Sequence, residues 1–352
     1  MAYLSALAQS LTPYTAGEQP KDQKYIKLNT NENPYPPSPK AEAAMREEAL
    51  TLRLYPDMDC TALRQAIAQA NGVPIEYVFA GNGSDEVLAF AFAAFFAGKR
   101  MLAPDVTYSF YPVYAKLFGA QYETVPVLDD LSVDVPGLLQ DAPVALANPN
   151  APTGLMLPVG TIARMAEHLK RQGAVFLVDE AYSAFAPENA TGLLKDFDNL
   201  LIVRTLSKSH ALAGLRVGYA LGQPGLIDGL NRVKDCFNSY SLDRLAQAAS
   251  LAAITDAAYY KDINQKVVKT RDWTYQALTD AGIFVLPSQT NFLFVKADEQ
   301  NAAWVLSALK NKGILVRHFN KPRIAAYLRI SIGTQEEMEI VVRELIALIK
   351  KD

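Results

Sequence analysis

Residues 205–218 read TLSKSHALAGLRVG and lie between two apolar runs, 200–203 and 217–221. Both runs are typical of buried strands, so the residues between them should emerge at one edge of a sheet. This segment holds one lysine, Lys208, and one arginine, Arg216. Burial disfavours the charged form of a lysine and lowers its pKa. A neutral amine of this kind can attack a carbonyl group and form a Schiff base.

The same segment carries groups that suit a phosphate. Thr205, Ser207 and Ser209 supply hydroxyl groups, and Arg216 supplies a forked guanidinium group. An amine that captures an aldehyde next to a phosphate clamp points to pyridoxal phosphate, which carries both groups. The alternative is that Lys208 lies in a surface loop and Arg216 forms a structural ion pair. The segment alone leaves both interpretations open.

Composition limits the classes of protein to consider. The chain has 352 residues, half of them hydrophobic and one fifth charged, which suits one large domain and a smaller one. The net charge of −3 gives no basic footprint for nucleic acid or an anionic membrane. Cys60 and Cys236 have no paired spacing, which favours a reducing cytoplasm, and three scattered histidines argue against a metal site.

The order of apolar runs predicts an α/β fold. Strands are expected near residues 77, 101, 122, 144, 175, 200 and 217, with helices between most of them. Such alternation favours a large, mostly parallel sheet flanked by helices. We expect an N-terminal arm over 1–25, a large domain over 26–255 and a smaller α+β domain over 256–352.

Two further candidates follow strands. A glycine turn at 81–84 precedes an apolar helix expected over 85–97, and this arrangement can bind a phosphate through backbone N–H groups. Asp85 and Glu86 argue against that role, because carboxylates compete for the positive end of the helix dipole. Tyr108 follows the strand near residue 101 and is placed to stack on a planar ring, although packing explains most such tyrosines.

An acidic pair ends the apolar run near residue 175. Asp179 and Glu180 should point to opposite faces of the sheet, so at most one of them can serve a given site. Asp179 lies at the carboxyl end of the strand, where ligands bind in open α/β folds. A carboxylate beside a pyridine nitrogen would keep that nitrogen protonated. Asp179 could equally cap a helix.

Eight runs spread over residues 28–334 carry a resemblance to a known family. They are LNTNENPYPPSP, RLYPD, AGNGSDEVL, NPNAPTG, VDEAYSAF, TLSKSHALAGLRVGY, TNFLFV and LRISIGT. In this order and spacing the chain resembles the fold type I pyridoxal-phosphate aminotransferases, and most closely the histidinol-phosphate aminotransferases. The resemblance implies a large pyridoxal-phosphate-binding domain and a smaller C-terminal domain.

The resemblance also implies a role for individual residues. Lys208 would be the Schiff-base lysine, Asp179 the partner of the pyridine nitrogen, and Tyr182 the partner of the ring hydroxyl. The implied cofactor contacts are Gly83, Ser84, Asp85, Tyr108, Asn150, Asp179, Tyr182, Thr205, Ser207, Lys208 and Arg216. Relatives carry asparagine where this chain has Ala151, so either Asn150 shifts to replace that contact or Tyr182 provides it alone.

Substrate and partner contacts are implied as well. Tyr55 would reach the cofactor phosphate of a neighbouring subunit, which implies a homodimer with shared sites. Arg329 would bind the carboxylate or phosphate of the substrate, with help from Arg317 and Tyr14. The expected partners are an amine or amino-acid substrate and a 2-oxo acid, with no nucleic acid and no membrane.

The resemblance implies a ping-pong transamination between histidinol phosphate and 2-oxoglutarate, as in histidine biosynthesis. An aromatic amino-acid aminotransferase is the alternative, because the same arginines would hold an α-carboxylate. A non-catalytic pyridoxal-phosphate-binding regulator is a more remote alternative. Such regulators usually carry a DNA-binding segment, and no basic helix-turn-helix pattern is visible at either end of this sequence.

Overall fold

The computed structural model describes residues 3–14, 17–297 and 301–350. Among these residues the largest sheet has seven strands in the order β2–β8–β7–β6–β5–β3–β4. The strands are β2 (Val78–Asn82), β3 (Arg100–Pro104), β4 (Gln121–Val125), β5 (Val144–Ala147), β6 (Phe176–Asp179), β7 (Leu200–Thr205) and β8 (Val217–Leu221). Every strand predicted for the large sheet is present. Only β8 runs against its neighbours, so the predicted mostly parallel α/β sheet is confirmed.

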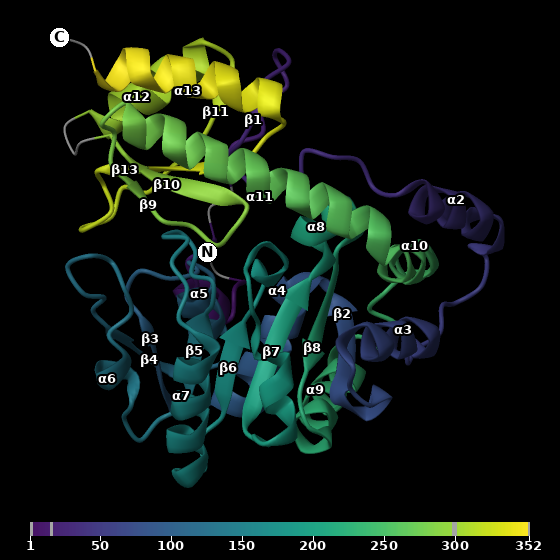
Figure 1. Ribbon diagram of the computed structural model, residues 1–352. Coiled ribbons are helices and arrows are strands. Elements are labelled where there is room, and N and C mark those ends of the chain that lie inside the picture. Colours follow the sequence, from purple (N-terminus) through teal and green to yellow (C-terminus); the bar gives the residue numbers. More distant parts are fainter. Residues whose placement is uncertain (1–2, 15–16, 298–300, 351–352) are drawn as a thin grey trace.

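Helices cover both faces of this sheet (Figure 1). The helices of this unit are α2 (Pro39–Glu48), α3 (Thr61–Asn71), α4 (Gly83–Ala91), α5 (Tyr111–Leu117), α6 (Val135–Leu138), α7 (Val159–Arg171), α8 (Leu206–Ser209), α9 (Pro224–Phe237) and α10 (Arg244–Thr255), of which α2 and α10 lie beyond the β2 edge of the sheet (Figure 1). In β6, Phe176 and Val178 pack on the side of α7, whereas Leu177 packs on the side of α4 and α9. Burial on both faces explains why these strands are continuous apolar runs.

The helix predicted over 85–97 is a composite. It comprises α4 followed by one π-helical segment, η3 (Phe92–Phe96). Short 3₁₀ turns elsewhere connect the main elements. They are η1 (Ala49–Thr51), η2 (Ile75–Tyr77), η4 (Ser183–Phe185), η5 (Ala190–Lys195) and η6 (Ala213–Leu215).

A second unit is built around an antiparallel sheet that has four strands within the described part of the chain, in the order β12–β13–β10–β9. These strands are β9 (Val285–Leu286), β10 (Phe292–Lys296), β12 (Arg317–His318) and β13 (Tyr327–Ser331). The helices α11 (Ala257–Asp280), α12 (Ala302–Asn311) and α13 (Gln335–Ile349) belong with it. The long α11 runs from α10 into this unit, where it lies below α13 in the view of Figure 1.

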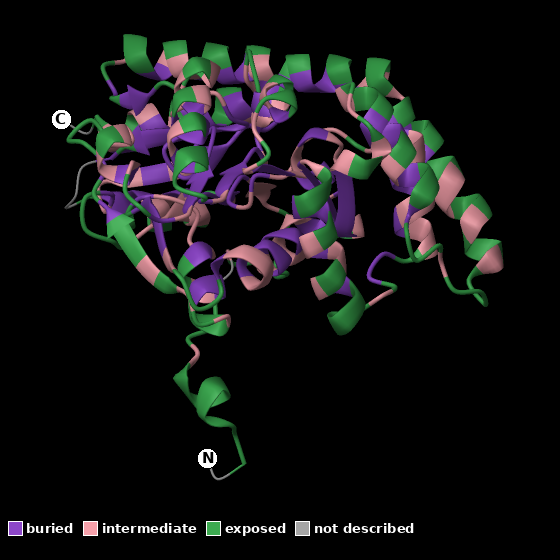
Figure 2. Cartoon of the chain, turned by 90° about the horizontal axis from the view of Figure 1, so that it is seen from below, coloured by how far each residue is buried: buried purple, intermediate pink, exposed green. Residues whose placement is uncertain are grey.

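The N-terminal region divides into two parts. The helix α1 (Ala6–Ser10) is exposed and extends away from the body of the molecule in Figure 2. Further along, β1 (Ile26–Lys27) pairs in parallel with β11 (Ile314–Leu315). Residues 26–27 therefore lie against the C-terminal unit, although the predicted domain limits assign them to the large domain.

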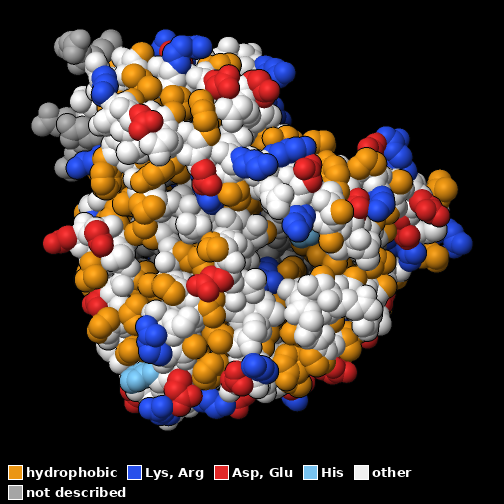
Figure 3. All heavy atoms as spheres, viewed as in Figure 1, with side chains coloured by type: hydrophobic (Ala, Val, Ile, Leu, Met, Phe, Trp, Pro, Cys, Tyr) orange, Lys and Arg blue, Asp and Glu red, His pale blue; other side chains and the backbone are white. Residues whose placement is uncertain are grey.

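Charges on the face shown in Figure 3 are mixed, with lysine and arginine interspersed among aspartate and glutamate. None of the helices in the described ranges is long and apolar enough to cross a membrane. Over the same ranges, no group of three or more His, Cys, Asp or Glu side chains is arranged to hold a metal ion.

Candidate active site

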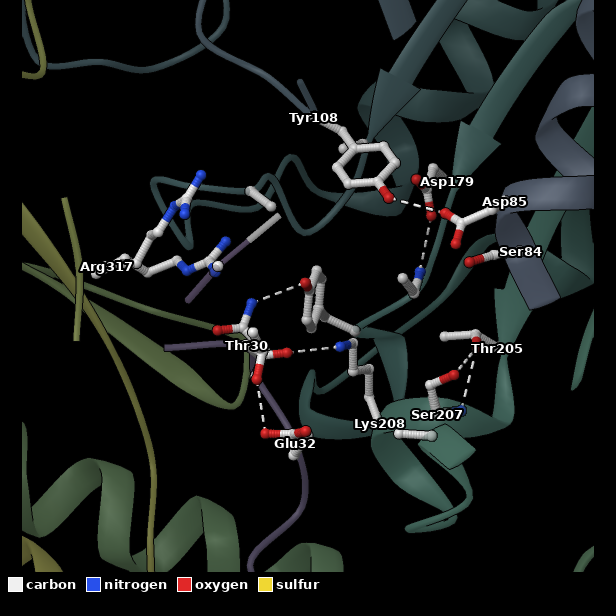
Figure 4. A pocket seen from close by; sticks show the side chains of 18 of the residues that line it. Thr30, Glu32, Ser84, Asp85, Tyr108, Asp179, Thr205, Ser207, Lys208 and Arg317 are labelled. Atoms are coloured by element: carbon white, nitrogen blue, oxygen red, sulfur yellow. Dashed lines mark hydrogen bonds between the residues drawn. The ribbon is translucent and has the colours of Figure 1, made fainter. Parts of the chain in front are cut away.

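A cavity of about 380 Å³ lies where the carboxyl ends of the parallel strands meet the C-terminal unit. Most predicted site residues line it: Tyr14, Ser84, Asp85, Tyr108, Asp179, Tyr182, Thr205, Ser207, Lys208, Arg216, Arg317 and Arg329. Figure 4 shows side chains from both units pointing into this cavity, with Lys208 and Asp179 from the large sheet and Arg317 from the other side. A cavity of this size suits a cofactor-sized molecule.

Lys208 follows β7 in the short helix α8. Thr205 caps this helix, because its Oγ1 accepts a hydrogen bond from the backbone N–H of Ser207 at 3.1 Å. The Nζ of Lys208 donates to the carbonyl oxygen of Thr30 at 2.9 Å. Burial lowers the pKa of Lys208 to about 8, and the positive charge of Arg329 adds to this effect. The amine is therefore about half neutral near pH 8, where an ordinary lysine is almost fully charged.

Asp179 ends β6 and is 5% exposed. Its Oδ2 accepts a hydrogen bond from Tyr111 Oη at 3.2 Å, and its Oδ1 accepts one from the Ala181 N–H at 3.1 Å. Burial raises the pKa of this carboxyl group to about 7. Glu180 lies on the opposite face and pairs with Arg204 at 2.7 Å. The prediction that these two acids point to opposite faces of the sheet is confirmed.

The glycine turn lies beside the guanidinium group of Arg216. A Cβ added at Gly83 would lie 2.7 Å from Nη2 of Arg216. At Gly218 the added Cβ would lie 2.3 Å from the backbone N of Ser84. Gly218 is therefore required for the close approach of β8 and α4, whereas Gly83 is favoured by its positive φ of 79°.

The two acids at the start of α4 behave differently. Asp85 faces the cavity, where it accepts hydrogen bonds from Arg216 Nη2 at 2.7 Å and from Tyr108 Oη at 2.9 Å. Glu86 accepts from the backbone N–H of Asn82 at 2.6 Å. The sequence suggested that both carboxylates would compete with a phosphate for the positive end of the helix dipole. Asp85 is instead paired with Arg216, and Glu86 caps the start of the helix through the Asn82 N–H.

The loop that follows β5 does not bring Asn150 to the cavity. The Asn150 amide donates to the carbonyl oxygen of Val106 at 3.0 Å and to Thr153 Oγ1 at 2.9 Å. Its Oδ1 accepts from Thr107 Oγ1 at 3.2 Å. These bonds hold the loop together, and Ala151 lines the cavity instead. The prediction that Asn150 contacts the cofactor is corrected here.

Tyr182 is buried, and its ring packs edge-on against Phe292 with centroids 5.1 Å apart. Its Oη accepts a hydrogen bond from Asn31 Nδ2 at 2.9 Å. Burial is the main reason that the pKa of Tyr182 is raised. Tyr182 therefore presents a neutral hydroxyl group that another residue orients.

Two arginines form the far side of the cavity. Arg317 in β12 and Arg329 in β13 are cross-strand partners. Arg329 Nη2 donates to the carbonyl oxygen of Asn29 at 3.1 Å, whereas its buried Nε has no hydrogen-bond partner among the described residues. The guanidinium carbon of Arg329 lies 5.4 Å from the ring centroids of both Phe292 and Phe319. Burial lowers the pKa of Arg329.

Tyr14 and Tyr55 differ in their positions. Tyr14 lines the cavity and stacks on Phe110, with ring centroids 4.4 Å apart. Tyr55 is 80% exposed, packs near Tyr240 and is not among the residues that line the cavity of its own chain. Its predicted contact across a subunit interface stays a prediction.

Several cavity residues were not singled out from the sequence. Thr30, Asn31 and Glu32 come from the amide-rich segment before the first proline run. Tyr111, at the start of α5, is fully buried and supports the site through its hydrogen bond to Asp179 without lining the cavity. The signal available for the first three was the run LNTNENPYPPSP, which composition alone interprets as a polar loop. For Tyr111 the sequence carried no signal other than its nearness to Tyr108.

The side chains of the cavity fit pyridoxal phosphate. The amine of Lys208 suits the aldehyde, and the buried carboxyl of Asp179 suits a ring nitrogen. Arg216 and the turn formed by Gly83 and Ser84 suit the phosphate. Arg317 and Arg329 also line the cavity, and their guanidinium groups suit a further anion.

The sequence matches the family of class I and II aminotransferases over residues 23–345. It is 47% identical to a histidinol-phosphate aminotransferase of Clostridium botulinum, and the alignment covers 99% of each chain. It is 49% identical to one of Acetobacter pasteurianus, over 97% of each chain. The structure resembles the histidinol-phosphate aminotransferase of Sinorhizobium meliloti in complex with pyridoxal-5'-phosphate, with a TM-score of 0.89, 28% identity, and 99% and 98% of the two chains covered. The chain therefore belongs to the class I and II aminotransferases and is a pyridoxal-phosphate-dependent enzyme of that family.

Proposed function

We propose that this enzyme transfers an amino group between histidinol phosphate and 2-oxoglutarate, in histidine biosynthesis. The single observation that carries the proposal is the cross-strand pair Arg317 and Arg329, which faces the cavity away from the phosphate turn. A substrate with its own phosphate needs a second anion site, and two guanidinium groups provide one. The names of the relatives described above support the same substrate.

The roles of the residues follow from their positions. Pyridoxal phosphate, when bound, supplies an aldehyde that captures the amine and a ring that accepts electrons. With a pKa of about 8, Lys208 is partly neutral near pH 8, so its Nζ could take the proton from the amino-bearing carbon of the substrate and deliver it to the carbon that the cofactor aldehyde contributes. Asp179 would hold a protonated ring nitrogen, and Tyr182 would donate a hydrogen bond from its hydroxyl group to the ring oxygen.

Phosphate binding is assigned to the large unit. Arg216, the hydroxyl groups of Thr205 and Ser207, and the turn at Gly83 and Ser84 surround the same end of the cavity. Tyr108 lies over this end and would stack on the ring. The two ends of the cavity thus carry positive charge for two different anions, one on the cofactor and one on the substrate.

An aromatic amino-acid aminotransferase is the second candidate, because aromatic rings surround the arginine pair. Phe292 and Phe319 flank Arg329, and Tyr14 stacks on Phe110 near the same end. A single-turnover assay of the holoenzyme, following the loss of its yellow colour, should separate the candidates. Histidinol phosphate should react with a higher kcat/KM than phenylalanine or tyrosine. Faster reaction with phenylalanine than with histidinol phosphate would favour the second candidate.

We also propose a homodimer in the cytoplasm, with Tyr55 contributed across the interface. Support comes from the exposure of Tyr55 together with exposed apolar side chains nearby, Leu50, Leu52 and Phe237. The exposed α1 segment in Figure 2 also suits contact with a neighbour. Mixing Lys208→Ala subunits with Tyr55→Ala subunits tests this. A shared site predicts that mixed dimers recover one intact site, whereas unshared sites predict no recovery.

A further inference from the structure

The contact on Tyr182 comes from an unexpected part of the chain. Position 151 is alanine, and the amide of Asn150 is used within its own loop. The amide that reaches Tyr182 belongs to Asn31, which is 151 positions away in sequence and 2% exposed. Asn31 Nδ2 lies 2.9 Å from Tyr182 Oη.

Ser331 contacts both the backbone and the side-chain amide of Asn31. The Ser331 Oγ accepts the backbone N–H of Asn31 at 2.9 Å and lies 3.0 Å from Asn31 Oδ1. A hydroxyl group has one hydrogen to donate, and here that hydrogen goes to Oδ1. Oδ1 is therefore the end at Ser331, and Nδ2 is the end at Tyr182. Turning the amide over would reverse both bonds, because Nδ2 would then donate to Ser331 Oγ and Oδ1 would accept from Tyr182 Oη.

This orientation determines what Tyr182 can do. Because Asn31 donates to the phenol oxygen, it occupies a lone pair of Tyr182 and leaves the hydroxyl hydrogen unused. A donated bond also makes the phenol a stronger donor in its turn. The hydrogen of Tyr182 is thus free for a partner in the cavity. An acceptor in place of Nδ2 would instead take that hydrogen away from the cavity.

The backbone of Asn31 supports the same geometry. Its φ of 57° lies in the left-handed region, where asparagine is better tolerated than most residues. Asn291 Nδ2 donates to the Asn31 carbonyl oxygen at 3.0 Å. The residue is therefore held by β13 through Ser331 and by the residue before β10 through Asn291. Its side chain has little freedom to leave Tyr182.

We propose that Asn31 is a positioning residue of the cofactor site and that it orients the Tyr182 hydroxyl group toward the ring oxygen. An asparagine at position 151 would share this task, but this chain has alanine there. This inference rests on the proposed role of Tyr182. The charged groups that face Tyr182 are Arg329 from β13 and Asp179 from β6, with the phenol of Tyr14 also near. In the described part of the chain, the hydrogen bond to Tyr182 Oη is made by Asn31.

The consequence can be observed in the colour of the bound cofactor. A hydrogen bond donated to the ring oxygen draws away its negative charge and weakens its hold on a proton at the neighbouring nitrogen. Losing the bond should therefore raise the pH midpoint at which the visible absorbance of the holoenzyme changes. One hydrogen bond corresponds to a shift of about half a unit to one unit.

The experiment compares four holoenzymes by spectrophotometric pH titration: wild type, Asn31→Gly, Tyr182→Phe and the double variant. Glycine tolerates the positive φ and brings no charge. Asn31→Gly should raise the midpoint by about half a unit to one unit in the wild-type background and add nothing to Tyr182→Phe. Asn31→Asp keeps the shape but accepts a hydrogen bond, so it should raise the midpoint at least as far as Asn31→Gly.

Two more variants keep the test decisive. Asn199→Asp alters a partly buried asparagine whose amide bonds two backbone carbonyl groups near the start of β7, so it controls for general destabilisation. It should leave the midpoint unchanged. If Asn31→Gly does not fold, Ser331→Ala frees the amide to turn over and should give part of the same shift.

The inference is overturned if Asn31→Gly leaves the midpoint at its wild-type value, or shifts it equally when Tyr182 is already phenylalanine. Failure of the proposed function has a different signature. In that case the wild type would form no yellow complex with pyridoxal phosphate, or Tyr182→Phe alone would leave the midpoint unchanged.

Discussion

Replacing Gly218 by alanine should displace the phosphate turn. Gly218 lies in β8 opposite Gly81 of β2, directly under the start of α4. The new Cβ would lie 2.3 Å from the backbone N of Ser84 and 2.5 Å from the carbonyl carbon of Gly83. Ordinary contact begins at 3.4 Å, so the turn or the strand must move by about 1.1 Å. Both obstacles are backbone atoms, so no side-chain rotation can relieve the clash.

The size of the effect follows from that displacement. Overpacking of this kind costs about 1–3 kcal/mol of the free energy of unfolding. If the turn absorbs the movement, a comparable loss should appear in cofactor binding. The Kd for pyridoxal phosphate should then rise by about tenfold to hundredfold. A misplacement of about 1 Å can also reduce the rate by about a hundredfold.

The assay is a titration of cofactor-free protein with pyridoxal phosphate, followed by visible absorbance, together with urea unfolding. Gly214→Ala is the matched control, because it lies in the same segment and its added Cβ meets no atom within 4 Å. It should bind and unfold like the wild type. The reasoning is refuted if Gly218→Ala keeps wild-type affinity and stability, or if both alanine variants weaken binding equally.

Three other predictions concern charged groups. In cofactor-free protein, labelling of Lys208 by an amine reagent should depend on pH with a midpoint near its pKa of about 8. An ordinary lysine has a pKa of ~10.4, and a midpoint near that value would contradict the role of burial. Burial raises the pKa of Asp179 from 3.8 to about 7, so the folded state holds its proton more tightly than the unfolded state. The free energy of unfolding of the cofactor-free wild type, measured relative to that of the Asp179→Asn variant, should therefore fall as the pH rises from about 4 to about 7. Urea unfolding of both proteins across this range measures the difference, and parallel pH profiles for the two proteins would refute the prediction. Arg329→Gln should raise the KM for histidinol phosphate by about tenfold to hundredfold, because hydrogen bonds to charged groups contribute about 1.5–3 kcal/mol. Steady-state kinetics measures this change, and an unchanged KM would exclude Arg329 from the anion site.

The sheet was predictable because its strands carry local signals. Runs such as Phe176–Asp179 are apolar on both faces, and their ends identified Asp179, Lys208 and the glycine turn together. The opposite directions of Asp179 and Glu180 followed from the period of a strand alone. These inferences needed only neighbouring residues.

The remaining site residues depend on contacts between distant positions. Asn31 lies 151 positions from Tyr182 and 300 from Ser331, so no local pattern could pair them. The same holds for the pairing of β1 with β11, which attaches residues 26–27 to the C-terminal unit. Asn150 was misassigned for a related reason, since its bonds to Val106 and Thr153 are visible only once the loop is folded.

The attachment of β1 to β11 couples the two halves of the cavity mechanically. The segment after β1 is tied to the C-terminal unit again where Ser331 N–H meets the Leu28 carbonyl oxygen. It carries the Thr30 oxygen that receives Lys208 and the Asn31 amide that holds Tyr182. A tilt of the unit that bears Arg329 would move this segment with it, so the position of that arginine is linked to the reacting amine and the ring-binding phenol.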